Sequence, residues 1–254
     1  MSESKSTSWE SVGKWYQQSV GEEGHYYHQH VVIPGALKLL ALNENSNLLD
    51  VACGQGILAR SLPKSASYLG IDVSPSLIKE AKRISKNPKH EYLLLNATQP
   101  LKLDKKFSHA AILLALQNIE KGDAVLKNVS SVLEKNGKLL IVLNHPCFRI
   151  PRQSSWQVDQ SKKLQYRRID SYGSELQVPI QAHPSKGENS ASTWTFHHPL
   201  STYTQWLADA GFHIVLMEEW YSNKVSTGGA AKMENRSRKE IPLFLAILAT
   251  AATR

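Results

Sequence analysis

The segment Leu48–Ile57, which reads LLDVACGQGI, constrains the fold more than any other part of this sequence. Its apolar start and Asp50 predict a buried strand, and Gly54 and Gly56 predict a tight turn directly after it. Glycine at both positions permits a positive φ and lets the main chain lie close to a ligand. A helix that follows such a turn offers unpaired N–H groups at its start. We therefore expect a ligand at the end of this strand, held mainly by backbone.

Two further predicted strands end in polar residues. The strand Tyr68–Asp72 ends in a carboxylate, and Ser74 and Pro75 then predict the cap and first residue of a helix. The strand Glu91–Leu95 is followed by Asn96, Ala97 and Thr98. A carboxylate at the first of these positions can accept both hydroxyls of a ribose, while an amide and backbone at the second could read an adenine edge.

This series of strand ends resembles the class I S-adenosylmethionine-dependent methyltransferases, specifically the small-molecule branch of type 11 and type 25 domains. The resemblance runs from about Asn47 to Asn144 and resumes at about Leu200. It implies an α/β fold with a doubly wound, seven-stranded, mostly parallel sheet, and S-adenosylmethionine as cofactor. It also implies an enzyme that transfers a methyl group to oxygen or nitrogen of a small organic acceptor and releases S-adenosylhomocysteine.

The resemblance also implies roles for individual residues. The first turn would form the wall for the methionine part of the cofactor, Asp72 would hold the ribose, and Val73 would lie against the adenine. Family members commonly have Asp where this chain has Asn96, so an uncharged amide oxygen would meet the adenine amino group. Gln117 and Asn118 would lie next to the methyl group. The residues implied to bind the cofactor are Asp50, Ala52, Gly54, Gly56, Asp72, Val73, Asn96, Ala97, Leu114, Ala115 and Asn118.

The glycine turn also fits the G-x-G-x-x-G/A pattern of dinucleotide-binding folds, with Ala59 in the last position. A short-chain reductase would additionally need a Tyr-x-x-x-Lys pair, in which the lysine lowers the pKa of the tyrosine. No tyrosine of this sequence has a lysine four residues later. The sequence therefore favours the methyltransferase over a nicotinamide enzyme.

Strands and helices alternate through most of the chain, which predicts a parallel sheet covered on both faces. The predicted strands are 48–52, 68–72, 91–95, 109–116, 138–144, 212–218 and 243–249, the last antiparallel as the resemblance implies. The predicted helices are 57–62, 76–86, 122–135 and 200–210, with Asp123 capping the third and Gly137 ending it. Together they predict one methyltransferase domain over residues 1–254.

Three segments fall outside this alternation. Residues 1–42 predict an N-terminal helical cap after about eight disordered residues, with Pro34 opening its last helix. Residues 145–199 are too long for an ordinary connection, and their spaced aromatic residues favour a substrate lid over a partly disordered insertion. Residues 223–240 predict a mobile surface loop.

Composition limits the class of protein. A chain of 254 residues with 41% apolar content can bury a full core. It has no apolar run near the ~20 residues of a spanning helix, and it starts with a polar segment, so we expect a soluble cytoplasmic protein. Only Cys53 and Cys147 occur, without metal-ligand spacing, so we expect neither a disulfide framework nor a metal.

His145 is the candidate catalytic base. It follows the fifth predicted strand at the edge of the sheet where ligands bind, and histidine titrates near neutral pH. A structural turn set by Pro146 and Pro151 is the alternative.

Arginine and histidine supply the other candidate substrate contacts. Arg149 and Arg152 would orient an acidic acceptor by bidentate hydrogen bonds. The run His25–His30 would cover the cofactor, as an N-terminal helix often does in this branch, with plain packing or a metal site as alternatives. The further candidates are Tyr26, His30 and His198.

The net charge of +8 could indicate a polyanionic partner. Basic residues on the second predicted helix are more simply a solvated face, whereas a second group follows the fifth strand and could steer an acidic small molecule. This second group consists of Arg149, Arg152, Lys162, Lys163, Arg167 and Arg168. Methylation of RNA or protein, or a non-catalytic regulatory protein that binds the cofactor, are the alternatives to the small-molecule enzyme. No appended RNA-binding module is visible.

Overall fold

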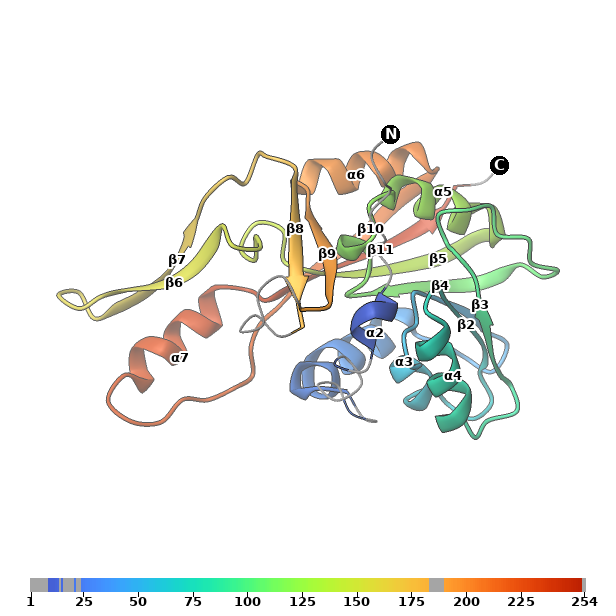
Figure 1. The fold of residues 1–254 in the computed structure, drawn as a ribbon, viewed down its shortest axis with the longest axis horizontal. Helices are drawn as coiled ribbons and strands as arrows, with labels where there is room; N and C mark the ends of the chain where they lie inside the picture. Colours follow the sequence, from blue (N-terminus) through green and yellow to red (C-terminus); the bar gives the residue numbers. More distant parts are fainter. Residues whose placement is uncertain (1–8, 14, 16–20, 22–23, 183–189, 253–254) are drawn as a thin grey trace.

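A seven-stranded sheet in the order β10-β11-β5-β4-β1-β2-β3 forms the centre of the protein (Figure 1). The computed structural model describes residues 9–13, 15, 21, 24–182 and 190–252. The strands are β1 (Asn47–Val51), β2 (Ser67–Asp72), β3 (His90–Leu94), β4 (Phe107–Leu113), β5 (Leu133–Asn144), β10 (Phe212–Trp220) and β11 (Phe244–Ala251). Strands β3, β2, β1, β4 and β5 are parallel, and β11 is antiparallel to both of its neighbours, as predicted.

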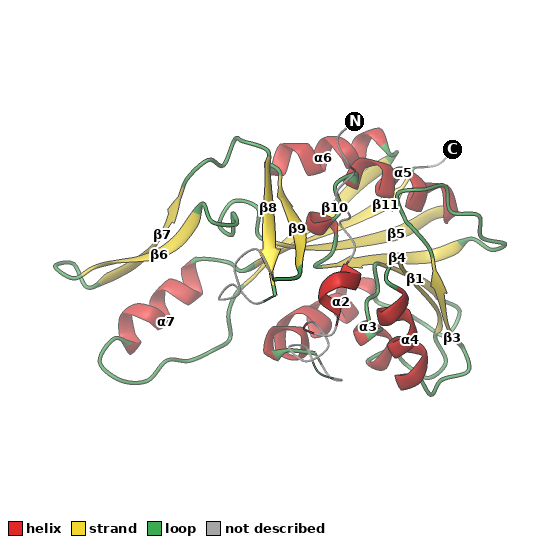
Figure 2. Cartoon of the chain, in the orientation of Figure 1, coloured by secondary structure: helices red, strands yellow, loops and turns green. Residues whose placement is uncertain are grey.

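Helices cover both faces of this sheet (Figure 2). On one face lie α5 (Gly122–Val132) and α6 (Leu200–Asp209), whose apolar residues join the cluster that contains Leu49 and Ile141. On the other face lie α2 (Ile33–Leu40), α3 (Ile57–Arg60) and α4 (Pro75–Ile84), packed on Leu48 and Leu140. Consecutive residues of β1 and of the second half of β5 therefore enter opposite cores, which explains why Leu139–Leu143 reads as a continuous apolar run.

Helix boundaries follow the predicted signals in one case and depart from them in another. The hydroxyl of Ser74 accepts a hydrogen bond from the Leu77 N–H, and Pro75 opens α4 as predicted. Asp123 does not cap α5, since its carboxylate pairs with Lys127 at 3.3 Å. Gly137 does not end that helix either, because residues 133–144 already belong to β5.

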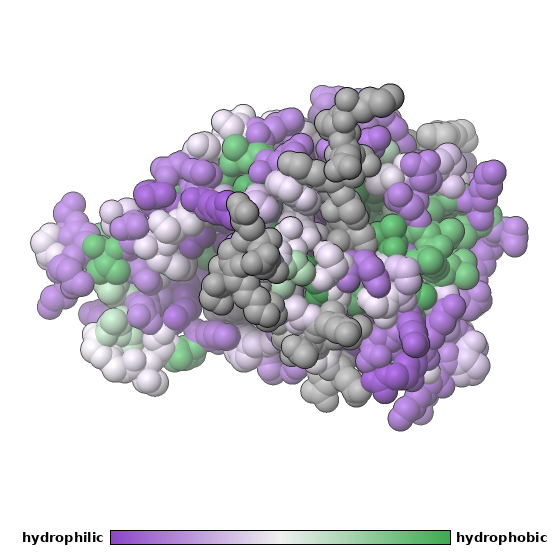
Figure 3. All heavy atoms as spheres, viewed as in Figure 1, coloured by the Kyte–Doolittle hydropathy of each residue, from purple (hydrophilic) through white to green (hydrophobic). Residues whose placement is uncertain are grey.

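The exposed face of α4 and the residues after it carry one group of basic side chains. Leu77, Ile78 and Ala81 are buried on the sheet side of this helix. The basic residues on and after it are exposed, and hydrophilic residues gather over α4 at the lower right of Figure 3. This is the solvated face that the sequence predicted.

The N-terminal region contains short helices in its described part. These are the 3-10 helix η1 (Trp9–Val12), the π-helix η2 (His28–Val32) and α2, with Pro34 in the first turn of α2. The prediction of disorder concerned the first eight residues, which lie outside the described residues. No helix in the described part of the chain is both long and apolar enough to cross a membrane.

Two hairpins and one helix extend from the carboxyl end of β5 and β10. Residues 145–199 form the hairpin β6 (Ser154–Asp159) and β7 (Leu164–Ile169) and the hairpin β8 (Leu176–Gln181) and β9 (Ser192–His197). The predicted loop 223–240 instead contains α7 (Ala231–Glu240), which lies beside β7 (Figure 1). Sequence reasoning missed α7 because its polar residues bury only Ser237, so no apolar stripe marks it.

Gly35 permits close packing between α2 and β10. A Cβ atom at this position would lie 2.6 Å from Cζ2 of Trp220, which a real side chain does not tolerate. In an unhindered helix, replacing glycine by alanine stabilises by up to about 1 kcal/mol. We expect Gly35→Ala to destabilise the protein by about 1–3 kcal/mol instead. Thermal unfolding measures this, with Gly173→Ala as control because nothing lies within 4 Å of a Cβ there. Equal melting temperatures of parent and Gly35→Ala would contradict the close contact.

Candidate functional site

A cavity of about 930 Å³ lies at the carboxyl ends of the parallel strands. Eight of the residues implied to bind the cofactor line it as pairs after successive strands: Ala52 and Gly54, Asp72 and Val73, Asn96 and Ala97, and Leu114 and Ala115. Asn118, in the 3-10 helix η3 (Leu116–Asn118), lines it too. The parallel strands bring these positions to one edge of the sheet because all their carboxyl ends point the same way.

Asp72 connects the first turn to the end of β2. Its Oδ2 accepts a hydrogen bond from the Gly54 N–H at 2.9 Å, and its Oδ1 accepts one from the Ser74 N–H at 2.8 Å. Gly54 has a φ of 56°, the left-handed conformation that the sequence predicted for the turn. Burial raises the pKa of Asp72, and the N–H donors oppose this rise. Each carboxylate oxygen can accept a further hydrogen bond, so the side chain can also hold a polyol.

Asp50 and Gly56 lie behind this turn and do not line the cavity. Asp50 is 3% exposed, and its Oδ2 accepts a hydrogen bond from the Tyr68 hydroxyl at 2.7 Å. Burial raises the pKa of Asp50 to about 7. At Gly56, which has a φ of 77°, a Cβ atom would lie 2.9 Å from the ring of Tyr92. The two residues support the turn from the protein side.

The ends of β3 and β4 present amide groups to the cavity. The Oδ1 atom of Asn96, expected to face an adenine amino group, accepts hydrogen bonds from the N–H and the hydroxyl of Thr98 at 3.0 and 2.8 Å. The amide nitrogens of Gln117 and Asn118 both donate to the Leu114 carbonyl. The Oε1 atom of Gln117 is buried and has no hydrogen-bond partner among the described residues. A buried acceptor of this kind is available to a ligand donor.

The N-terminal region forms a second wall. Trp9, Trp15, His25, Tyr27 and His28 all line the cavity. Burial, together with the neighbouring His25, lowers the pKa of His28 to about 4, so its imidazole is neutral at neutral pH. Within the described residues, no three His, Cys, Asp or Glu side chains come together as metal ligands.

The substrate candidates divide into two groups. Arg149 and Arg152 line the cavity, and so does Arg167, which the sequence placed in the basic group but not in the site. Strand alternation in β7 would have shown that Arg167 and Arg168 face opposite sides. Tyr26, His30 and His198 do not line the cavity: Tyr26 and His30 contact each other's rings, and His198 lies 3.2 Å from Glu175 and packs on Trp206.

His145 lies outside the cavity lining as well. Its side chain is buried, and its Nε2 is 2.9 Å from Oε1 of Glu219 on β10. Its Nδ1 accepts a hydrogen bond from the Cys147 N–H at 3.2 Å. Burial lowers the pKa of His145, and Glu219 opposes this shift. With both ring nitrogens engaged, this side chain connects the end of β5 to β10.

Comparisons with known proteins give the family. A family model described as a methyltransferase domain matches residues 49–139. A solved structure from Listeria monocytogenes, described as a putative S-adenosylmethionine-dependent methyltransferase, is 25% identical with a TM-score of 0.68, covering 86% of this chain and 96% of that one. Residues 49–139 therefore form a methyltransferase domain, and the chain has the fold of the S-adenosylmethionine-dependent methyltransferases. Its cofactor is S-adenosylmethionine, and the Gly54 turn and Asp72 lie inside the matched region.

This chain covers less than two thirds of the length of two curated relatives. Uncharacterized methyltransferase C70.08c of Schizosaccharomyces pombe is 26% identical over 72% of this chain and 65% of that protein. The ubiquinone/menaquinone biosynthesis C-methyltransferase UbiE of Rickettsia typhi is 31% identical over 39% of this chain and 44% of that protein. The matched region of UbiE is therefore under half of its length.

The buried Asp50 carboxyl should make stability depend on pH. Its pKa is about 7 in the folded protein and about 4 in an unfolded chain. The contribution of this group is therefore complete below about pH 4 and is lost as the pH rises through about 7. From this group alone, the unfolding free energy should fall by about 2 kcal/mol between about pH 5 and pH 8.

Asp50→Asn should lose less stability over the same range, because an amide does not titrate and can still accept the Tyr68 hydrogen bond. Denaturant unfolding at both pH values measures the difference. An equal loss in parent and variant would show that Asp50 has an ordinary pKa.

Proposed function

We propose that this protein transfers the methyl group of S-adenosylmethionine to oxygen or nitrogen of a small organic acceptor. The observation that carries this proposal is the continuity of the cavity. One end is bordered by the residues after β1 to β4, and the other by Arg149, Arg152 and Arg167 of the insertion 145–199. A volume of about 930 Å³ is at the upper end for small-molecule sites, which fits a cofactor together with a second small molecule.

The residues present fit the cofactor. S-adenosylmethionine supplies an electrophilic methyl group when it is bound. In the proposal, Asp72 accepts hydrogen bonds from the ribose hydroxyls, Val73 lies against the adenine, and the left-handed turn at Ala52 and Gly54 brings the main chain close to the methionine part. The Oε1 atom of Gln117, which has no partner among the described residues, accepts a hydrogen bond from the cofactor or the acceptor.

The chain would act mainly by positioning the acceptor and excluding water. Holding two reactants in line can supply several kcal/mol of rate enhancement, and removal of water strengthens the polar contacts to the acceptor. The insertion 145–199 and the N-terminal residues Trp9, Tyr27 and His28 support this role because they line the cavity from outside the sheet. His145 is not part of the proposal as a base, since its ring nitrogens are bonded to Glu219 and Cys147.

Methylation of a small molecule is better supported than methylation of RNA or protein. The basic residues of α4 lie on a solvated helix face, and Arg149 and Arg167 are directed to the cavity. Release of labelled S-adenosylhomocysteine on incubation with S-adenosylmethionine and a pool of small metabolites tests turnover. Turnover with RNA or protein alone would favour the larger acceptors, and binding of cofactor without turnover would favour a regulatory protein.

Asp72 provides the sharpest test of the cofactor site. Asp72→Asn keeps the size of the side chain and an acceptor for one backbone N–H but removes the charge. Loss of charge-assisted hydrogen bonds to the ribose should weaken S-adenosylhomocysteine binding by about 2–3 kcal/mol. Calorimetry measures the affinity, with the exposed Asp104→Asn as control for loss of one negative charge. An affinity of Asp72→Asn within twofold of the parent would remove Asp72 from the site.

A further inference from the structure

The guanidinium of Arg149 has no hydrogen bond or ion pair with any described residue, although its side chain is partly buried and lines the cavity. Burial lowers its pKa, the direction expected for a cation that has lost water, and the nearby Tyr27 opposes this shift. A cation removed from water without a partner costs several kcal/mol of folding free energy. Such a side chain is retained where a ligand supplies the missing negative charge.

Arg167 reaches the same cavity from β7. Its Nε donates to the Phe148 carbonyl and its Nη2 to the Ser154 hydroxyl, both at 2.8 Å, and the guanidinium lies 5.3 Å from the ring centre of Trp156. These contacts fix its orientation, and no carboxylate of the described residues pairs with it. Its pKa is lowered by burial and, in addition, by the positive charge of Arg149. Two like charges therefore face one space.

Arg168, the next residue along β7, provides the contrast. It points to the opposite side of the strand, where its Nη2 lies 2.7 Å from Oδ2 of Asp170. The carboxylates that line the cavity are Asp72, bonded to the backbone at the cofactor end, and Glu120. No ion pair joins either of them to Arg149 or Arg167 in the described part of the chain. Among the described residues, the outward Arg168 has an acidic partner and the inward pair has none.

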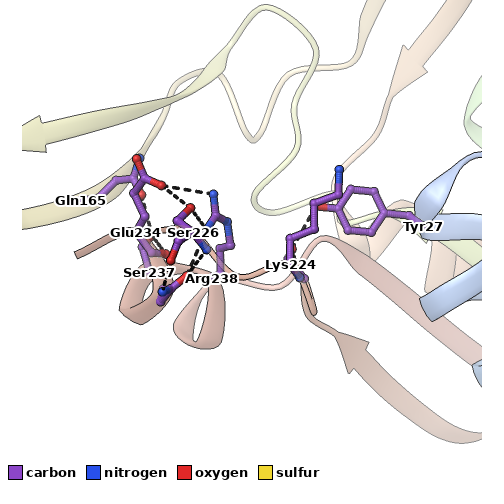
Figure 4. Close-up of polar contacts among 9 residues, drawn as sticks. Tyr27, Gln165, Lys224, Ser226, Glu234, Ser237 and Arg238 are labelled. Atoms are coloured by element: carbon purple, nitrogen blue, oxygen red, sulfur yellow. Dashed lines mark hydrogen bonds and ion pairs between the residues drawn. The ribbon is translucent and has the colours of Figure 1, made fainter. Parts of the chain in front are cut away.

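The segment after β10 holds this arrangement in place. Ser237 of α7 donates a hydrogen bond to Oε1 of Gln165 on β7 at 2.7 Å, and the same segment is cross-linked internally by Ser226, Glu234 and Arg238 (Figure 4). Figure 4 also shows Lys224 beside Tyr27, with its Nζ 5.1 Å from the ring centre. Tyr27 lines the cavity next to Arg149. The hydrogen bond from α7 therefore stabilises β7, the strand that carries Arg167.

We propose that the acceptor is a small molecule with a carboxylate or a comparable oxyanion, bound by the guanidinium of Arg149 together with Arg167. This inference rests on the proposed methyl transfer and adds the chemical class of the acceptor. Guanidinium groups match oxyanions by paired, charge-assisted N–H donors. Arg152 contributes less to binding of the oxyanion, because its Nη2 already donates a hydrogen bond to the Pro179 carbonyl at 3.1 Å. The anionic group is bound at the insertion end of the cavity, and the methyl-accepting atom faces the cofactor end.

The first experiment needs no substrate. Arg149→Met has a side chain of similar reach without the charge, and it should melt ~2–5 °C higher than the parent in buffer of low anion content, with S-adenosylhomocysteine at saturation. Arg168→Met, which breaks an exposed ion pair, should melt within about 1 °C of the parent. A clear fall in the melting temperature of Arg149→Met would show that the protein itself satisfies the guanidinium, and would overturn the proposal.

The second experiment separates the acceptor from the cofactor as the source of the oxyanion. Binding of S-adenosylhomocysteine is compared with that of 5′-methylthioadenosine, which lacks the amino-acid carboxylate. Arg149→Met should bind both as the parent does. A loss of tenfold or more for S-adenosylhomocysteine alone would assign Arg149 to the cofactor carboxylate and overturn the proposal.

The third experiment identifies the charge of the acceptor by function. A metabolite pool is divided by anion exchange, and each fraction is incubated with enzyme and labelled S-adenosylmethionine. Methyl transfer should follow the retained, anionic fraction and fall by about 10²-fold in Arg149→Met. Transfer confined to the unretained fraction would overturn the anion site. Absence of transfer in every fraction would count against the proposed methyl transfer, while the melting experiment still decides the anion site.

Discussion

The hydrogen bonds of the Asp72 carboxylate are the interactions on which the cavity wall at the ends of β1 and β2 depends. The two oxygens of Asp72 hold the Gly54 N–H of the first turn and the Ser74 N–H at the start of α4. Through them, the ends of β1 and β2 keep one relative position, with Asp50 and Tyr68 bonded behind the turn. A buried carboxylate bonded to two backbone donors cannot be moved without leaving those donors unpaired. The cavity wall is therefore built before any ligand arrives.

The other half of the cavity comes from segments that lie outside the parallel sheet. The hairpins β6–β7 and β8–β9, the helix α7 and the N-terminal residues meet at the carboxyl edge of the sheet. Few of their side chains enter the two apolar cores, so hydrogen bonds such as Ser237 to Gln165 and Tyr27 to Ser222 hold much of this wall. A wall held by hydrogen bonds rather than by an apolar core has a low local stability, so it can open to release a product.

Charge is distributed between the two ends of the cavity with opposite sign. Asp72 lies at the end bordered by the strands, and Arg149 and Arg167 lie at the end bordered by the insertion 145–199. The lining histidines His25 and His28 add little charge at neutral pH, since burial lowers the pKa of both. A bound pair in which the cofactor offers hydroxyls to Asp72 and the acceptor offers an oxyanion to the arginines would satisfy both ends.

The sequence by itself determined the seven-stranded sheet, the glycine turn and the polar strand ends, because apolar periodicity, turn glycines and helix caps are local signals. Only the tertiary structure decided which side chains reach the cavity. His145 turns to Glu219 on a strand far along the chain, Asp50 turns to Tyr68, and Arg167 rather than Arg168 faces inward. The helix α7 also needed tertiary contacts, since it has no apolar stripe of its own. Strand alternation shows that neighbouring residues face opposite sides, but it does not show which side meets a partner that is distant in sequence.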